Sequence, residues 1–105
     1  MRKVKITVMR QAAYTDLMEK YEMPTAHACD HHVGEVFVSD GYHRPDGLCE
    51  SAWGNLFPYV MALGAGGGDF FDGWMKDKNT AMISCNDGFR PVSFLLEAMS
   101  EDADV

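Results

Sequence analysis

The sequence predicts an α+β domain in which a mainly antiparallel sheet, or half-open barrel, of about four strands packs against one long helix and one short helix. Two observations predict this class. Four segments carry the alternation or β-branched composition of strands, and two carry the 3.6-residue spacing of amphipathic helices. The predicted order is strand, helix, strand, helix, strand, strand, and it ends in two adjacent strands that read as a hairpin.

The first half of the chain contains two predicted strands and the short helix. Val4, Ile6 and Val8 alternate with Lys and Thr, as in a strand with one buried face. Residues 14–22 place apolar side chains at i, i+3, i+4 and i+7, which predicts a short amphipathic helix. Residues 34–40 are rich in β-branched and aromatic residues and predict the second strand.

The second half contains the long helix and the hairpin. Residues 50–63 carry apolar side chains on one side of a helix, and Pro58 within it predicts a kink rather than a break. Residues 80–85 and 91–99 then predict two antiparallel strands joined by a turn at 86–88. These elements fit one domain covering residues 1–105, with an acidic tail that frays from about residue 100.

The glycine-rich segment 64–79 interrupts the regular elements between the long helix and the hairpin. It lacks the Lys-Ser/Thr pair and the preceding strand of a phosphate-binding loop. Its aromatic residues Phe70, Phe71 and Trp74 are expected to pin the loop onto the core or onto a second subunit. An apolar loop beside a sheet edge favours self-association, so we expect a homo-oligomer.

Composition excludes some classes of protein. The chain has 16 acidic and 9 basic residues and a formal net charge of -7, which argues against nucleic acid as a partner. Residues 1–10 mix charges with apolar residues, unlike a secretory signal, and no apolar run is long enough for a membrane span. We therefore expect a cytoplasmic protein whose cysteines are thiols or metal ligands rather than disulfides.

The three cysteines fall at the boundaries of predicted elements. Cys29 precedes the second strand, Cys49 precedes the long helix, and Cys85 ends the third strand. Such boundaries are where rigid elements present functional side chains to a cleft. Three of the four histidines lie in the eight residues 27–34, around Cys29. The cysteines are therefore the main candidates for chemistry.

Several motifs around the cysteines occur together in a known family. The chain carries Val-Gly-Glu-Val-Phe shortly after Cys29, then Pro-Asp-Gly-Leu-Cys-Glu-Ser-Ala-Trp, a glycine-rich stretch and Cys-Asn-Asp-Gly-Phe-Arg-Pro-Val-Ser-Phe. This set resembles a family of small uncharacterised three-cysteine proteins found largely in anaerobic bacteria and archaea. The resemblance implies that the three cysteines belong to one pattern and that an anaerobe is a plausible host. Some members carry a histidine soon after the first cysteine, which His31 or His32 supplies here.

A metal site is the first interpretation of these residues. Zinc takes four tetrahedral thiolate or imidazole ligands, and the proposed set is Cys29, Cys49, Cys85 and His32. Iron is the alternative metal, although an iron–sulfur cluster usually has four cysteines, so one ligand would be a histidine or come from a neighbouring subunit. No C-x-x-C pair holds two ligands locally, so the site requires the fold to bring distant segments together.

Two other interpretations remain open. Cys49 precedes a predicted helix N-terminus, whose free N–H groups favour a thiolate, so it is a candidate nucleophile or redox-active thiol. Glu50 and Asp46 oppose this effect through their negative charge. The third interpretation is a small ligand-binding or oligomerisation module without metal or catalysis, in which the thiols are buried apolar groups. Whether the protein is an enzyme, and which small-molecule ligand it takes, stays open on the sequence.

Overall fold

The computed structural model describes residues 1–24, 26 and 29–102, and within them it contains four strands and two helices. In chain order these are β1 (Arg2–Gln11), α1 (Thr15–Tyr21), β2 (Val36–Ser39), α2 (Glu50–Gly64), β3 (Thr80–Ser84) and β4 (Val92–Asp102). The predicted α+β class and the predicted order of elements are confirmed. Residues 103–105 and 27–28 lie outside the described part, as does residue 25.

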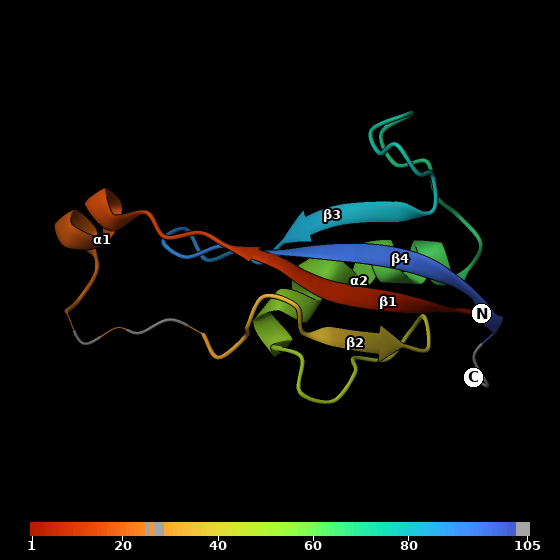
Figure 1. The fold of residues 1–105 in the computed structure, drawn as a ribbon, viewed down its shortest axis with the longest axis horizontal. Helices are drawn as coiled ribbons and strands as arrows, with labels where there is room; N and C mark the ends of the chain where they lie inside the picture. Colours follow the sequence, from red (N-terminus) through yellow and green to blue (C-terminus); the bar gives the residue numbers. More distant parts are fainter. Residues whose placement is uncertain (25, 27–28, 103–105) are drawn as a thin grey trace.

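The four strands form one open antiparallel sheet in the order β2-β1-β4-β3 (Figure 1). The first and last strands of the chain therefore lie side by side at its centre. Ile6 of β1 pairs with Phe37 of β2 and with Leu96 of β4, and Leu96 pairs in turn with Ala81 of β3. The sheet is open in the described residues, so the half-open barrel that the sequence allowed is not what forms.

One face of the sheet packs against α2, which lies across it in Figure 1. The alternation predicted for β1 is confirmed, because Val4, Ile6 and Val8 all point into this layer and are buried. From α2 the buried side chains come at helical spacing, with Leu56 and Val60 at its centre. Pro58 lies inside α2, and the helix continues through it. The core is therefore a single layer between the sheet and α2.

Helix α1 does not pack on the sheet, although its pattern led us to expect that it would. None of its residues is buried, and Figure 1 shows it beyond one end of the sheet. Leu17 and Tyr21, two apolar residues of the predicted stripe, are exposed. The chain carries α1 away from α2 after β1, so no described element covers its apolar side. The two-helix packing predicted from the sequence is wrong for α1.

The end of the last strand also differs from expectation. Strand β4 continues to Asp102, so the first residues of the acidic tail are part of the sheet instead of fraying. There Lys3 forms an ion pair with Glu101 at 3.2 Å.

In the glycine-rich segment, Phe70 packs against the core as expected, whereas Phe71 remains exposed. Within the described residues, neither helix is long and apolar enough to cross a membrane.

Candidate functional site

The three cysteines line one cavity at the end of the sheet where β1 ends and where β4 and α2 begin. Its volume is about 160 Å³. The lining residues are Cys29, Cys49, Ser51, Ala52, Cys85, Asn86, Asp87 and Arg90. The fold thus brings together three thiols that are 20 and 36 positions apart along the chain. All three are free thiols, with Cys29 exposed and the other two half-buried.

The central pair of strands places two of the thiols. Gln11, the last residue of β1, pairs with Val92, the first residue of β4. The Gln11 side-chain amide lies 3.7 Å from Cys29 Sγ, and the Val92 backbone N–H donates to Cys85 Sγ at 3.2 Å. Each of these sulfurs therefore faces an N–H donor at the same end of the sheet. Such donors stabilise a thiolate, whether free or bound to a metal.

Helix α2 places the third thiol. Cys49 is the N-cap residue of α2, and its carbonyl accepts the first helical hydrogen bond, from the Trp53 N–H, at 2.9 Å. Its thiol makes no hydrogen bond to the backbone N–H groups of the first helical turn. The sulfur is therefore available to a ligand in the cavity. In the first turn of α2, Ser51 Oγ donates to Asn86 Oδ1 at 3.3 Å, which joins the helix to the turn after Cys85.

The turn after β3 adds a carboxylate to the lining. The backbone N–H groups of Phe89 and Arg90 both donate to Asp87 Oδ1, at 2.8 and 3.1 Å. These two hydrogen bonds hold the pKa of the Asp87 carboxyl below its usual range, and the bond from Phe89 has the larger effect. Burial of the carboxyl acts in the opposite direction. Asp87 is therefore an anion beside the thiols at neutral pH. Its second oxygen, Oδ2, makes no hydrogen bond within the described residues.

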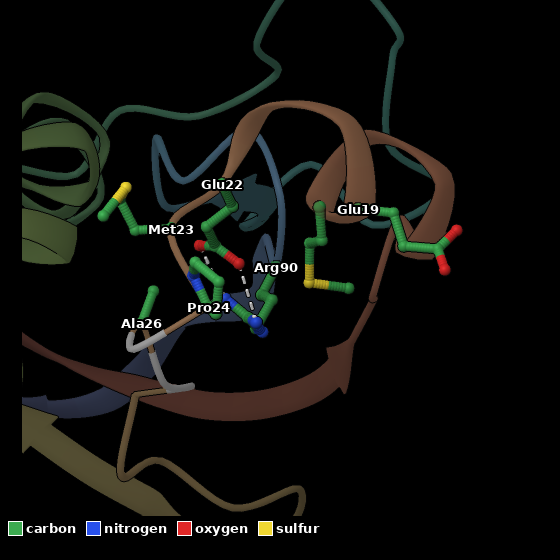
Figure 2. Close-up of a pocket in the computed structure, with 7 residues that line it drawn as sticks. Glu19, Glu22, Met23, Pro24, Ala26 and Arg90 are labelled. Carbon is green, nitrogen blue, oxygen red and sulfur yellow. Dashed lines mark hydrogen bonds and ion pairs between the residues drawn. The ribbon is translucent and has the colours of Figure 1, made fainter.

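Arg90 connects this cavity to the segment that carries Cys29. Its guanidinium forms a two-pronged ion pair with Glu22, with N–O distances of 2.8 and 2.9 Å (Figure 2). The hydrogen bond from the Arg90 guanidinium to Glu22 raises the pKa of Arg90 above its ordinary value. On its other side Arg90 borders a second, wider hollow of about 380 Å³, which Met23 and Pro24 also line. The ion pair thus fastens the chain after α1 to the turn that follows Cys85.

The histidines are placed differently from the sequence-based prediction. The predicted ligand His32 has an exposed side chain and does not line the cavity. His31 is buried instead, and its Nε2 accepts the backbone N–H of Cys49 at 3.1 Å. Its Nδ1 lies 3.0 Å from Glu35 Oε1, so the proton of the neutral ring is on Nδ1 and is donated to Glu35. His27 lies outside the described residues.

The cavity as it stands is not arranged around one ion. Among the residues that the structure describes, no group of three or more His, Cys, Asp or Glu side chains could hold a metal ion as positioned. Sequence reasoning found the three cysteines, because their boundary positions were visible. It gave no role to Gln11 and Ser51, since nothing in their local sequence shows that β1 ends and α2 begins beside the thiols.

Comparison with protein-family models, curated proteins and solved structures finds no match to this chain. The function is therefore argued from the cavity alone.

Proposed function

We propose that the protein binds a metal centre through the thiolates of Cys29, Cys49 and Cys85. The observation that carries the proposal is that three thiols from three separate segments line one cavity. Thiolates are the preferred ligands of zinc and of iron in iron–sulfur clusters. The N–H groups directed at Cys29 and Cys85 add support, because hydrogen bonds to sulfur stabilise its anionic, metal-bound form.

Geometry favours a cluster of iron and sulfide over a single zinc ion. Tetrahedral zinc with Zn–S bonds of about 2.3 Å needs sulfur atoms only about 3.8 Å apart. The described residues hold no group placed for one ion, yet the thiols border a common cavity of about 160 Å³. A water molecule in the liquid occupies about 30 Å³, so this cavity has room for several atoms. A cluster spreads its ligands over several metal atoms, so it does not require the three sulfurs to converge on one ion.

The fourth ligand in this proposal is the carboxylate of Asp87. It lines the cavity with the thiols, and its lowered pKa keeps it ionised. It takes the place that the sequence suggested for His32, whose side chain is exposed. On binding, each thiol loses its proton to solvent, so uptake of the metal is coupled to the release of protons.

The test is metal uptake by protein purified without oxygen. The chain is reconstituted with ferrous iron and sulfide, or separately with zinc, and the bound metal and sulfide are measured per chain together with the absorption spectrum. We expect stoichiometric iron and sulfide, and their loss in each of Cys29→Ser, Cys49→Ser and Cys85→Ser. Ser51→Ala is the matched control, because it changes the same lining without removing a sulfur. Circular dichroism verifies that each variant is folded.

Different results decide between the candidate centres. Stoichiometric zinc without iron uptake would keep the thiolate site and reject the cluster. Metal retained in all three serine variants, or no stoichiometric metal in the wild type, would overturn the proposal. Asp87→Asn tests the fourth ligand, since loss of the carboxylate should alter the spectrum of the bound cluster without removing the three thiolates.

A second function, a reactive thiolate at Cys49, has one specific observation in its favour. Cys49 lies at the N-terminus of α2, its sulfur makes no capping bond, and it faces the cavity. His31 does not act as its base, because Nε2 of the ring already accepts the Cys49 N–H. Alkylation of the metal-free protein followed by peptide mapping tests this function. Cys49 should react faster than Cys29 despite its lower exposure, and the reverse order would reject it.

A further inference from the structure

The face of the sheet opposite α2 carries a continuous set of side chains, which we call the open face. Its first row crosses all four strands through the paired residues Val36, Thr7, Leu95 and Met82. The second row likewise crosses them through Val38, Lys5, Glu97 and Thr80. Figure 1 shows α2 on one side of the sheet, and neither described helix lies on the other side. No described helix covers the open face, although Thr80 at its corner is buried.

The open face exposes apolar side chains that a sheet facing water would not favour. Val36 is 51 % exposed, Val38 46 % and Met82 37 %, and they come from the two edge strands. Between them Leu95 is half-buried in the first row. Antiparallel sheets with one solvated face usually place polar residues there. The exposed Val36, Val38 and Met82 therefore indicate a surface that is covered by a partner.

The charges of the open face favour a second copy of this chain as the partner. The whole chain carries a net charge of -7, so most pairs of surfaces on two copies repel each other. The two rows of the open face are balanced, since they contain one Lys and one Glu. Lys5 and Glu97 are cross-strand neighbours, and within the described residues neither forms an ion pair in its own chain. A two-fold axis between them would place each Lys5 against the Glu97 of the other copy.

The area of the whole sheet face sets an upper limit on the interface that the open face can form. The four strands contain 10, 4, 5 and 11 residues, which at about 3.4 Å per residue and about 4.8 Å between strands gives about 500 Å² in projection. This is below the roughly 800 Å² per partner of a standard interface, so we expect a dimer that dissociates on dilution.

We propose that two copies of this chain associate open face to open face as a two-fold symmetric dimer. The two sheets pack about 10 Å apart, as in a β-sandwich, and the Val and Met side chains of the edge strands interdigitate. Each α2 then lies on the outside of the dimer. This arrangement is independent of the metal proposal, because α2 and the cysteine cavity remain on the solvent side of each sheet.

Sedimentation equilibrium of the full chain tests the proposal. The wild type should have about twice the chain mass of 11.7 kDa at high concentration and dissociate on dilution. Met82→Lys, on the open face, should raise the dissociation constant by about tenfold or more. The matched control is Met61→Lys on α2, where the methionine is similarly exposed, at 40 %. It should leave the dissociation constant unchanged.

A charge exchange tests the orientation of the two copies. Lys5→Glu alone should weaken the dimer, and the double variant Lys5→Glu with Glu97→Lys should restore it, because the intermolecular pairs are rebuilt with reversed sign. Circular dichroism shows that the variants fold. A monomeric wild type would overturn the proposal. A dimer equally sensitive to Met61→Lys and Met82→Lys, or one that the charge exchange does not restore, would also reject this interface.

Discussion

The imidazole Nε2 of His31 accepts a hydrogen bond from the backbone N–H of Cys49 at a distance of 3.1 Å. The ring is buried, and it packs edge-on against Phe37 and Phe94. It therefore accepts the N–H of Cys49, the N-cap residue of α2, a task that a Glu or Gln side chain in the first turn performs in a capping box. Through this bond, the segment before β2 holds the residue whose sulfur faces the cavity.

Removal of the His31 ring should destabilise the protein. In His31→Ala, the half-buried N–H of Cys49 loses its acceptor and the space beside Phe94 is left empty, so we expect a loss of about 1–3 kcal/mol in the free energy of unfolding. Urea denaturation measures it. His32→Ala is the control, because this neighbouring ring is exposed, and its change should stay within about 0.5 kcal/mol. Equal losses in the two variants would contradict the capping role.

The acid stability of the protein should depend on Glu35. The backbone N–H of His32 donates to its carboxylate at 2.7 Å and lowers the pKa of Glu35, and the hydrogen bond with His31 lowers it further, although burial acts in the opposite sense. Because the folded-state pKa is depressed, this stabilisation is present above the ordinary carboxyl pKa and is lost as pH falls through the depressed value.

Glu35→Gln should therefore be less stable than the wild type at neutral pH, and the difference should shrink as the pH is lowered below the ordinary carboxyl pKa. Urea denaturation across this pH range measures the difference. Glu101→Gln serves as a control, since this carboxylate pairs with Lys3 at an exposed site. A difference between wild type and Glu35→Gln that stays constant with pH would show that the charge of Glu35 is not what stabilises the fold.

The ion pair between Glu22 and Arg90 should hold Cys29 near the cavity. Both side chains are mostly buried, at 15 % and 18 % exposure, and two N–O contacts join them. Glu22→Gln should therefore destabilise the protein more than Glu101→Gln does, because the latter breaks an exposed pair. It should also speed alkylation of Cys29 several-fold in the metal-free protein. Unchanged alkylation of Cys29 would show that the ion pair does not restrain this segment.

Two glycines of α2 should respond in opposite directions to the same substitution. A Cβ atom on Gly64 would lie 2.8 Å from the Cα of Gly41, whose own φ is +96°, so neither backbone can give way easily. Gly64→Ala should cost about 1–3 kcal/mol of stability. A Cβ on Gly54 would meet nothing within 4 Å, and Gly54→Ala should stabilise the helix by about 0.5–1 kcal/mol. Thermal denaturation of both variants checks the contrast.

The amphipathic patterns show what local sequence can predict about the two helices and what it cannot. Both helices were predicted from apolar spacing, and both form, yet only α2 buries its apolar side. Periodicity shows that a stripe exists but contains no information about which element covers it. The same limit applies to the histidines: His31 and His32 are neighbours of identical type, and only the path of the chain makes one a buried helix cap and leaves the other exposed.

By itself, the sequence determined the strands, the two helices and the placement of each cysteine at an element boundary, because these depend on residues close together in the chain. Only the tertiary structure decided that the three boundaries meet. The pairing of β1 with β4 places Gln11 beside Val92, and these residues direct N–H groups toward Cys29 and Cys85. That pairing joins the first strand to the last, and the long-range packing of side chains that selects it leaves no local pattern in the sequence.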